Sequence, residues 1–331
     1  MIHILNLGAG VQSTTLALMA CRGDIPRFDW CIFSDTRYEP KAVYTHLKWL
    51  VPQIEQAGMR FATVTVGNLK QDALDFRRNT VSADGKRFAS VPFHVSNPDG
   101  TSGLLNRQCT GEYKIKPIER FIKTDVLQIP SGKRMPVEPV VTQYFGITSD
   151  EGQRAAYPGR FKGKRKIVKD LFGEPQTVTW REWKPEKWRV SAYPFLGVEL
   201  HSNRKSTPLN WLPNTMTRQD CLVWLKTHYP DREIPRSACI CCPYRNNSEW
   251  RWMKQNEPEA WEDAVEFDRM IRQQERTHSV TPTGKVRKNL HGNIYVHSQR
   301  VPLDMADLSL GDTGQAGCGS LFDGQSGLCG Y

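Results

Sequence analysis

Several common signatures are missing from this chain of 331 residues. No apolar run is long enough to cross a membrane, and the apolar start is broken at Gly8 and lacks the basic region of a secretory signal. The eight histidines show neither zinc-protease nor zinc-finger spacing, and neither a Gly-x-Ser-x-Gly motif nor an internal repeat occurs. These absences argue against the common hydrolases and favour a cytoplasmic protein without a membrane partner.

Charge and cysteine are present in unusual proportions. Lys and Arg outnumber Asp and Glu by 45 to 35, so the formal charge is +10. This surplus favours anionic partners such as nucleotides, nucleic acid or an acidic carrier, although a soluble basic surface alone would also explain it. The nine cysteines are an odd number, scattered early and clustered late. That pattern suits metal or redox chemistry in a reducing compartment better than a disulfide framework.

Residues 2–15 predict a strand, a tight turn and the start of a helix. The turn and helix start read Gly-Ala-Gly-Val-Gln-Ser-Thr-Thr from Gly8. Backbone N–H groups at the positive end of a helix dipole suit a phosphate or another anion, and hydroxyls at Ser13, Thr14 and Thr15 add donors. The turn is not a Walker loop, because no Gly-Lys-Ser/Thr follows. An ordinary strand-to-helix turn is the alternative.

Strands and helices alternate after this turn. The predicted elements are a strand at 27–33, a helix at 41–57 kinked by Pro52, a strand at 60–66 and a short helix at 69–78. This order implies an α/β fold, a parallel twisted sheet with helices on both faces. Ligands of such sheets bind at the carboxyl ends of the strands. We therefore expect residues 8–15 and 34–36 to share one crevice.

The later elements are less regular. They are an irregular segment at 79–108, a helix after Thr110, a strand at 140–147, helices at 217–228, 248–254 and 258–276, and a Gly-rich tail at 310–331. Thr217 and Asp220 have the spacing of a capping box, which predicts the first residues of the helix at 217–228.

The turn resembles the phosphate-binding loop of the PP-loop superfamily, whose usual pattern is Ser-Gly-Gly-x-Asp-Ser. Its places are taken here by Gly8, Ala9, Gly10, Val11, Gln12 and Ser13. Gln12 replaces the usual Asp. Four further blocks resemble the phosphoadenylyl-sulfate reductase branch and its sulfur-transfer relatives: Phe33-Ser34-Asp35-Thr36, Arg107-Gln108-Cys109-Thr110 with Tyr113 to Ile118, Gly146-Ile147 with Asp150, Glu151 and Arg154, and Cys239 to Pro243 followed by an aromatic residue and an arginine. The resemblance covers roughly residues 1–55, 104–154 and 190–300, and several ordered blocks are more specific than one.

The resemblance implies a Rossmann-like fold of the PP-loop type that binds ATP or an adenylyl-sulfate by its phosphates. The implied cofactor-binding residues are Gly8, Ala9, Gly10, Gln12, Ser13, Thr14, Asp35, Thr36, Lys114 and Gly146, with the base and ribose near Asp35. Asp150, Glu151 and Arg154 are candidate catalytic residues that orient the substrate or hold Mg2+. A salt-bridged helix start would explain these three nearly as well.

Cysteines are expected to hold a metal. Cys239 and Cys242 have the Cys-x-x-Cys spacing that lets two thiolates reach one metal from a turn. Cys109 with Cys329 or Cys318 are the candidates that complete the site. All-thiolate ligation suits a [4Fe–4S] cluster or zinc, and the sulfur-handling relatives favour the cluster. Free thiols in a packed core are the alternative. In the reductases a C-terminal cysteine is the nucleophile, so Cys329 is also a catalytic candidate.

Residues 160–189 combine cations with tryptophans. Six basic residues lie between 160 and 169 without an acidic one among them, and three tryptophans alternate with basic residues from 180 to 189. Cations for phosphates and indole faces for splayed bases favour nucleic-acid contact. A solvated charged flap is the alternative.

We therefore expect four parts: a PP-loop nucleotide-binding α/β domain at 1–155, a basic and aromatic insertion or flap at 156–190, a helical cysteine-containing region at 191–300 packed on the first domain, and a Gly- and Cys-containing tail at 301–331.

The predicted function is an enzyme that adenylates an acceptor with ATP and delivers sulfur through the cluster. The acceptor is expected to be tRNA or DNA. A phosphoadenylyl-sulfate reductase that uses Cys329 and a thioredoxin-like reductant is one alternative. Because Gln12 replaces the usual Asp, a nucleotide-binding or nucleic-acid-binding protein without catalysis is another. The predicted partners are an adenine nucleotide, a nucleic acid and a sulfur donor or reductant, and a homodimer is left open.

Overall fold

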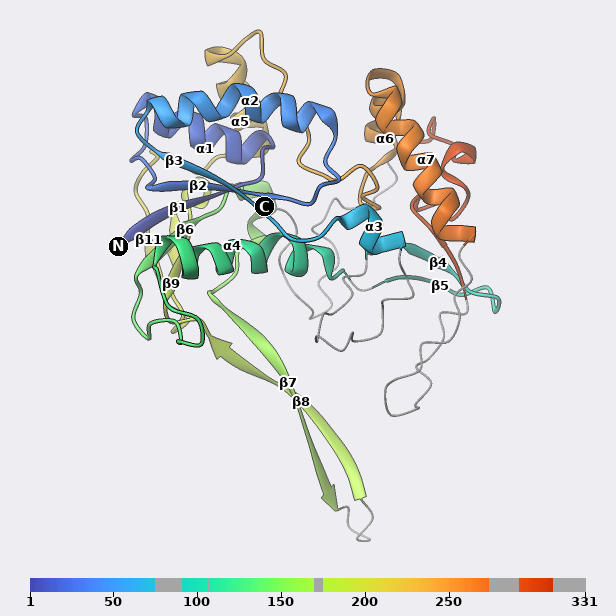
Figure 1. The fold of residues 1–331 in the computed structure, drawn as a ribbon, viewed down its shortest axis with the longest axis horizontal. Coiled ribbons are helices and arrows are strands. Elements are labelled where there is room, and N and C mark those ends of the chain that lie inside the picture. Colours follow the sequence, from blue (N-terminus) through green and yellow to red (C-terminus); the bar gives the residue numbers. More distant parts are fainter. Residues whose placement is uncertain (75–90, 106, 170–174, 274–291, 312–331) are drawn as a thin grey trace.

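The computed structural model describes residues 1–74, 91–105, 107–169, 175–273 and 292–311. Its centre is a seven-stranded sheet (Figure 1) made of β1 (Ile2–Leu7), β2 (Trp30–Asp35), β3 (Arg60–Thr65), β6 (Val141–Tyr144), β9 (Arg189–Tyr193), β10 (Val198–Leu200) and β11 (Ser206–Pro208). The strand order is β11-β10-β9-β6-β1-β2-β3. The strands from β9 to β3 are parallel, and β10 and β11 form an antiparallel edge. The predicted α/β class is confirmed.

β1 is the middle one of the five parallel strands, and its apolar residues are covered on both faces. Ile4, Leu5 and Leu7 are buried, as expected for a parallel strand that is covered on both sides. The chain runs outward from β1 in two directions, first through β2 and β3 and later through β6 and β9. The strand order therefore reverses between β1 and β6, which is where open α/β sheets bind ligands.

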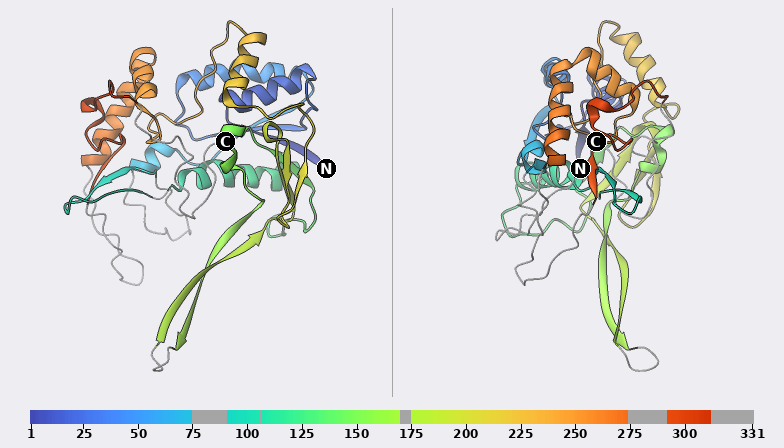
Figure 2. Two further views of the ribbon diagram at one scale, coloured as in Figure 1. Left: turned by 180° about the vertical axis from the view of Figure 1, so that it is seen from behind. Right: turned by 90° about the vertical axis from the view of Figure 1, so that its right-hand side faces the viewer.

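Helices cover both faces of the sheet (Figures 1 and 2). One face carries α1 (Val11–Arg22), α2 (Lys41–Gln56) and α5 (Arg218–His228), and the other carries α4 (Lys116–Phe121). α1 is buried on nearly every side because α2 and α5 both pack against it. α2 continues through Pro52, which removes one backbone hydrogen bond without ending the helix. The predicted capping box is confirmed, since Thr217 and Asp220 exchange side-chain-to-backbone hydrogen bonds.

A second core lies beyond the carboxyl ends of the parallel strands (Figure 1). It is built from α3 (Leu69–Leu74), α6 (Asn247–Asn256), α7 (Pro258–Gln273) and a sheet of β12 (Asn293–Tyr295), β4 (His94–Ser96) and β5 (Ser102–Leu104). Trp250, Phe267 and Ile294 are fully buried at its centre. Helices were predicted for all three of these helical segments, and the predicted ends at residues 78 and 276 lie outside the described residues.

The expectation of an irregular segment at 79–108 is wrong for β4 and β5. Val91, Phe93 and Val95 alternate and are buried, which is the pattern of a strand with one face in the core. β4 pairs with β5 and also with β12, about 200 residues later in the chain. Such a distant partner explains why the local sequence did not reveal the strand. Residues 75–90 and 106 lie outside the described part.

A long hairpin replaces a crossover helix between β6 and β9. β7 (Gly159–Lys169) and β8 (Pro175–Pro185) pair antiparallel within the predicted insertion and project from the body (Figures 1 and 2). The hairpin follows a short helical segment, η4 (Ser149–Arg154). None of the described helices combines the length and the apolar character that crossing a bilayer requires.

The surroundings of two buried histidines, His46 and His297, lower their pKa values. His46, on α2, has its Nε2 2.9 Å from the hydroxyl oxygen of Thr14. Burial, with a contribution from Arg232, lowers the pKa of His46 to about 4. Burial also lowers the pKa of His297 to about 4, and the nearby His94 adds to this effect. Both imidazoles are therefore neutral in the folded protein at pH 7.

The depressed pKa of His46 predicts acid sensitivity. Below pH 6.5 the unfolded chain protonates this histidine before the folded protein does, so stability falls as the pH decreases toward 4. For His46 alone the loss by pH 4.5 is roughly 2–3 kcal/mol. Urea unfolding at pH 7 and pH 4.5 measures this loss of stability. The loss between the two pH values should be smaller in His46→Gln than in the wild type by roughly 2–3 kcal/mol. His297→Gln should behave similarly. Equal losses in wild type and both variants would contradict the assignment.

Candidate functional site

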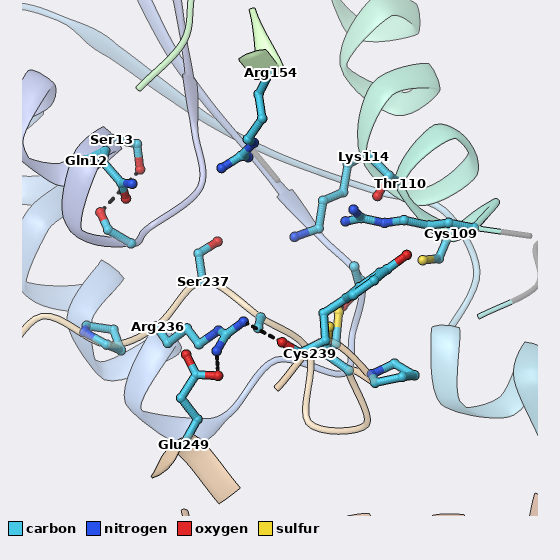
Figure 3. Close-up of a pocket in the computed structure, with 18 of the residues that line it drawn as sticks. Gln12, Ser13, Cys109, Thr110, Lys114, Arg154, Arg236, Ser237, Cys239 and Glu249 are labelled. Atoms are coloured by element: carbon cyan, nitrogen blue, oxygen red, sulfur yellow. Dashed lines mark hydrogen bonds and ion pairs between the residues drawn. The ribbon is translucent and has the colours of Figure 1, made fainter. Parts of the chain in front are cut away.

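A cavity of about 330 Å3 lies where the strand order reverses. Its walls come from segments that are far apart in the sequence: the end of β1 with the first turn of α1, the residues after β6, η4, the helical segment that starts at Thr110, and residues 235–246 before α6. Figure 3 shows side chains from these segments extending toward one space. The predicted crevice therefore exists among the described residues.

The first turn of α1 forms one wall of the cavity. Gly10 is the N-cap, no side chain caps the helix, and its first turn contains no acidic residue. Gly10, Val11, Gln12 and Ser13 all line the cavity. The first N–H groups of a helix have no partner inside the helix and carry the positive end of its dipole. This wall therefore suits an anion.

Two glycines allow the backbone to pack closely here. A Cβ at Gly146 would lie 2.8 Å from the backbone nitrogen of Ser13 and 3.0 Å from the carbonyl carbon of Gln12. A Cβ at Gly10 would lie 2.9 Å from the Cβ of Ser237. Both distances fall below normal contact, so a larger residue would push the α1 turn away from β6 or from the segment before α6.

The three hydroxyls at the start of α1 make contacts within the protein, and only that of Ser13 lies at the cavity. Thr14 contacts His46, and Thr15 donates to the carbonyl of Val11 at 2.8 Å. Ser13 stays at the cavity wall, where its hydroxyl oxygen accepts from the N–H of Gly8 at 3.1 Å. The prediction of three hydroxyl donors is wrong for Thr14 and Thr15, because successive side chains of a helix point about 100° apart.

A carboxylate faces the turn from η4. Gln12 donates from Nε2 to Glu151 Oε2 at 3.2 Å, and Arg154 donates from Nη1 to the same oxygen at 2.5 Å. Gln12 thus contacts a carboxylate that another segment supplies. Asp150 is not among the residues that line the cavity, and it accepts from the backbone N–H of Arg218 at 3.1 Å.

Positive charge dominates the cavity. Its basic lining residues are Arg107, Lys114, Arg154, Arg218 and Arg236. The acidic ones are Glu151 and Glu249, and Glu249 forms an ion pair with Arg236. Figure 3 shows Lys114, Arg154 and Arg236 approaching from three different elements. A surplus of cations around a helix N-terminus favours a ligand with several negative charges.

Lys114 keeps its charge although it is largely buried. Burial is the largest single effect and lowers the pKa of its ammonium, but the negative charges of Glu39, Cys239 and Cys242 together raise the pKa above its ordinary value. The ammonium nitrogen lies 3.9 Å from Glu39 Oε1. Glu39 is itself buried and accepts from the hydroxyl of Thr36 at 2.9 Å. Lys114 is thus a fixed cation in the wall.

Thiols line the same cavity. Cys109, Cys239, Cys241 and Cys242 all line it. The sulfur of Cys239 lies 3.3 Å from the hydroxyl oxygen of Thr36 and 3.5 Å from Glu39 Oε1. Burial raises the pKa of Cys109 and of Cys239, and the nearby Cys242 adds to both shifts. Buried thiols such as these become thiolates only if a cation compensates their charge.

The predicted metal ligands are only partly assembled. Among the residues that the structure describes, no group of three or more His, Cys, Asp or Glu side chains is arranged to hold a metal ion. Cys109, Cys239 and Cys242 share one cavity, whereas Cys329 and the alternative Cys318 lie outside the described residues. The donor type, three thiols, fits soft-metal or iron–sulfur chemistry.

Six of the ten predicted cofactor-binding residues line the cavity: Gly10, Gln12, Ser13, Thr36, Lys114 and Gly146. Gly8, Ala9, Thr14 and Asp35 are not among its lining residues. Asp35 accepts from the hydroxyl of Tyr44 at 2.9 Å and from the N–H of Arg37 at 2.7 Å. Its carboxylate is thus held by α2 rather than directed into the cavity. Of the catalytic candidates, Glu151 and Arg154 line the cavity.

Several residues of this site were not predicted from the sequence. They are Asn6, Glu39, Arg218, Arg236 and Ser237. Two had a usable local signal, because Arg236 and Ser237 come directly before the predicted cysteine turn. Glu39 and Arg218 reach the site only through tertiary packing.

The close packing at Gly146 predicts the effect of adding one methyl group. Gly146→Ala should displace the α1 turn and destabilise the fold by about 1–3 kcal/mol, as other overpacked sites do. Gly152→Ala is the matched control, since its Cβ would meet only Leu196 at an ordinary 3.8 Å. Urea unfolding of the three proteins measures the effect. If Gly146→Ala is as stable as Gly152→Ala, the packing argument is wrong.

Comparison with known proteins gave no match: a scan of protein-family models, a search of curated proteins and a search of solved structures each found none. The function has to be inferred from the chemistry of the cavity and from the motifs that line it.

Proposed function

We propose that this chain is a PP-loop-type enzyme with a Rossmann-like fold that adenylates an acceptor with ATP and then transfers sulfur to it. One observation carries the proposal: a single cavity combines the uncapped start of α1, five basic side chains and four thiols. A helix start surrounded by cations suits a triphosphate. Thiols beside it suit a sulfur-handling step.

The triphosphate would bind at the first turn of α1. The N–H groups of Gln12 and Ser13 would donate to phosphate oxygens, and Lys114, Arg154 and Arg236 would neutralise their charge. Glycine at positions 10 and 146 keeps this turn close to its neighbours. Thr36, at the end of β2, would lie on the side of the nucleoside.

Glu151 would hold Mg2+ or orient the acceptor. Its carboxylate could replace that of the Asp found in the usual PP-loop pattern, where this chain has Gln12. Gln12 and Arg154 fix the position of Glu151. Mg2+ prefers carboxylate oxygens together with substrate phosphates. This arrangement supports ATP cleavage over binding alone, although the loop carries Gln12.

The reaction has two balanced steps. An acceptor oxygen attacks the α-phosphorus of ATP, the bond to the bridging oxygen breaks, and pyrophosphate leaves with its electron pair. A hydrosulfide-level sulfur donor then displaces AMP, so that sulfur replaces the acceptor oxygen without net oxidation or reduction. In the first step, the chain's cations stabilise the negative charge that develops on the phosphate oxygens.

Cys109, Cys239 and Cys242, together with Cys329, would hold a [4Fe–4S] cluster, with zinc as the alternative metal. When bound, such a cluster supplies redox chemistry and a site for sulfur beside the acceptor. The seven described cysteines are all free, which agrees with the reducing cytoplasm that such a cluster needs.

The acceptor is proposed to be a nucleic acid, since the net charge of +10 favours a polyanionic partner. A phosphoadenylyl-sulfate reductase would use the same anion site with Cys329 as nucleophile. That reaction yields sulfite and no pyrophosphate, so one assay separates the two enzymes. A protein that only binds nucleotide would yield neither product.

The role of Glu151 is tested by charge removal. Glu151→Gln keeps an oxygen that can accept from Arg154 but removes the negative charge, so release of pyrophosphate from ATP and Mg2+ should fall at least about 10-fold. Glu55→Gln, on the exposed side of α2, is the matched control and should keep wild-type activity. Pyrophosphate is measured with a coupled phosphate assay in the presence of nucleic acid. Undiminished release from Glu151→Gln would remove Glu151 from the mechanism.

The cysteine assignment is tested by metal content. Protein purified without oxygen should be brown and contain iron and acid-labile sulfide, and Cys239→Ser and Cys242→Ser should each lose most of the iron. Cys21→Ser is the control, because Cys21 lies on α1 outside the cavity. Iron and sulfide are quantified per chain. A colourless, zinc-loaded wild type would exclude the cluster.

A further inference from the structure

The β7–β8 hairpin has no part in the chemistry proposed above, yet its composition is unusual. Residues 159–185 contain eight Lys or Arg residues and three acidic ones. Two views show the hairpin extending away from the body (Figures 1 and 2). A two-stranded ribbon without a core to cover it is only marginally stable in water. A partner that covers the hairpin would explain why it is kept.

The register gathers charge on one face of the hairpin. Arg160, Lys162, Lys164 and Lys166 occupy alternate positions of β7 and therefore share a face. Neighbouring cations in this row are about 7 Å apart along the strand. Opposite them on β8 lie Lys184, Glu182, Trp180 and Val178. Within the described part of the hairpin Glu182 is the one acidic side chain, and it pairs with Lys164 and Lys184.

Apolar side chains are exposed among these charges. Trp180 and Val178, on the face of this row, are 46% and 47% exposed, and Phe161 and Ile167, on the opposite face, are 54% and 69% exposed. These four are among eleven large apolar side chains that are exposed in the described residues. The face that carries the cations thus also presents Trp180 and Val178, and this combination fits a partner with both phosphates and apolar base edges.

We propose that the β7–β8 hairpin is an arm that enters the major groove of duplex DNA. Eleven residues per strand make the ribbon about 36 Å long. One turn of B-form DNA is of about the same length, and its major groove, about 12 Å wide, admits a two-stranded ribbon. The deep, narrow major groove of an RNA duplex does not admit side chains. The shape therefore favours DNA over RNA.

The hairpin is joined directly to the proposed catalytic cavity. Only residues 155–158 separate Arg154, which lines the cavity, from Gly159, where β7 begins. Tyr193 fixes this connection, since its hydroxyl donates to the carbonyl of Ala156 and accepts from the N–H of the same residue, both at 3.0 Å. The inference rests on the proposed function for the class of acceptor, and it names that acceptor as duplex DNA.

Fluorescence polarisation with a labelled 24-base-pair DNA duplex tests the arm. The triple variant Lys162→Gln, Lys164→Gln, Lys166→Gln should bind at least about 10-fold more weakly at 0.15 M salt, and the slope of log K against log salt should shrink by about 3. The matched control is Lys41→Gln, Lys48→Gln, Lys226→Gln, which removes the same charge from exposed positions on α2 and α5. It should bind DNA like the wild type, and both variants should keep the wild-type unfolding temperature.

The same assay with an RNA duplex and with single-stranded DNA of equal sequence tests the groove. Both should bind at least about 10-fold more weakly than duplex DNA. Equal binding of duplex DNA and RNA, or equal weakening in the hairpin and control variants, would overturn the proposal, as would tighter binding of polyglutamate than of DNA. Pyrophosphate release is a separate readout. A protein that binds DNA through the hairpin but does not cleave ATP would refute the proposed function and leave the arm standing.

Discussion

The concentration of positive charge around the first turn of α1 is the constraint on which the site depends. Five basic side chains line a cavity into which an uncapped helix start also opens. Like charges brought together in partly buried surroundings repel one another more strongly than in water. Glu39, Glu151 and Glu249 offset part of this repulsion. An anion with several charges would offset the rest, and for this reason we propose a triphosphate as the ligand.

Two cores meet to build this cavity. The parallel sheet supplies the α1 turn and Gly146 at the reversal between β1 and β6. The second core carries α6. The cysteine turn before that helix is joined to the segment after β2 by a hydrogen bond from the N–H of Ile240 to the carbonyl of Tyr38 at 2.9 Å. The buried Arg245 donates to the carbonyls of Ala238 and Cys239 and fixes the shape of the turn. These contacts hold the thiols next to the first turn of α1, where we propose that phosphate binds.

The parts of the structure that could be predicted from the sequence depend on interactions between neighbouring residues. The strand–turn–helix at residues 2–15 and the capping box at Thr217 depend on neighbours within a few residues. The crevice shared by residues 8–15 and 34–36 followed from strand topology, and Gln12 and Thr36 both line the cavity. The directions of the side chains were not predictable from the strand topology, since the hydroxyl of Thr14 contacts His46 and does not line the cavity. The strand β4 and the contact of Glu39 with Cys239 were not predictable, since their partners are about 200 residues away.

A crystal structure with a non-hydrolysable ATP analogue and Mg2+ tests the central claim most directly. The account predicts phosphate oxygens within hydrogen-bonding distance of the backbone N–H groups of Gln12 and Ser13, with Lys114 and Arg154 beside them and the metal near Glu151. An analogue bound elsewhere on the protein, or a cavity that excludes it while the fold is intact, would contradict the account.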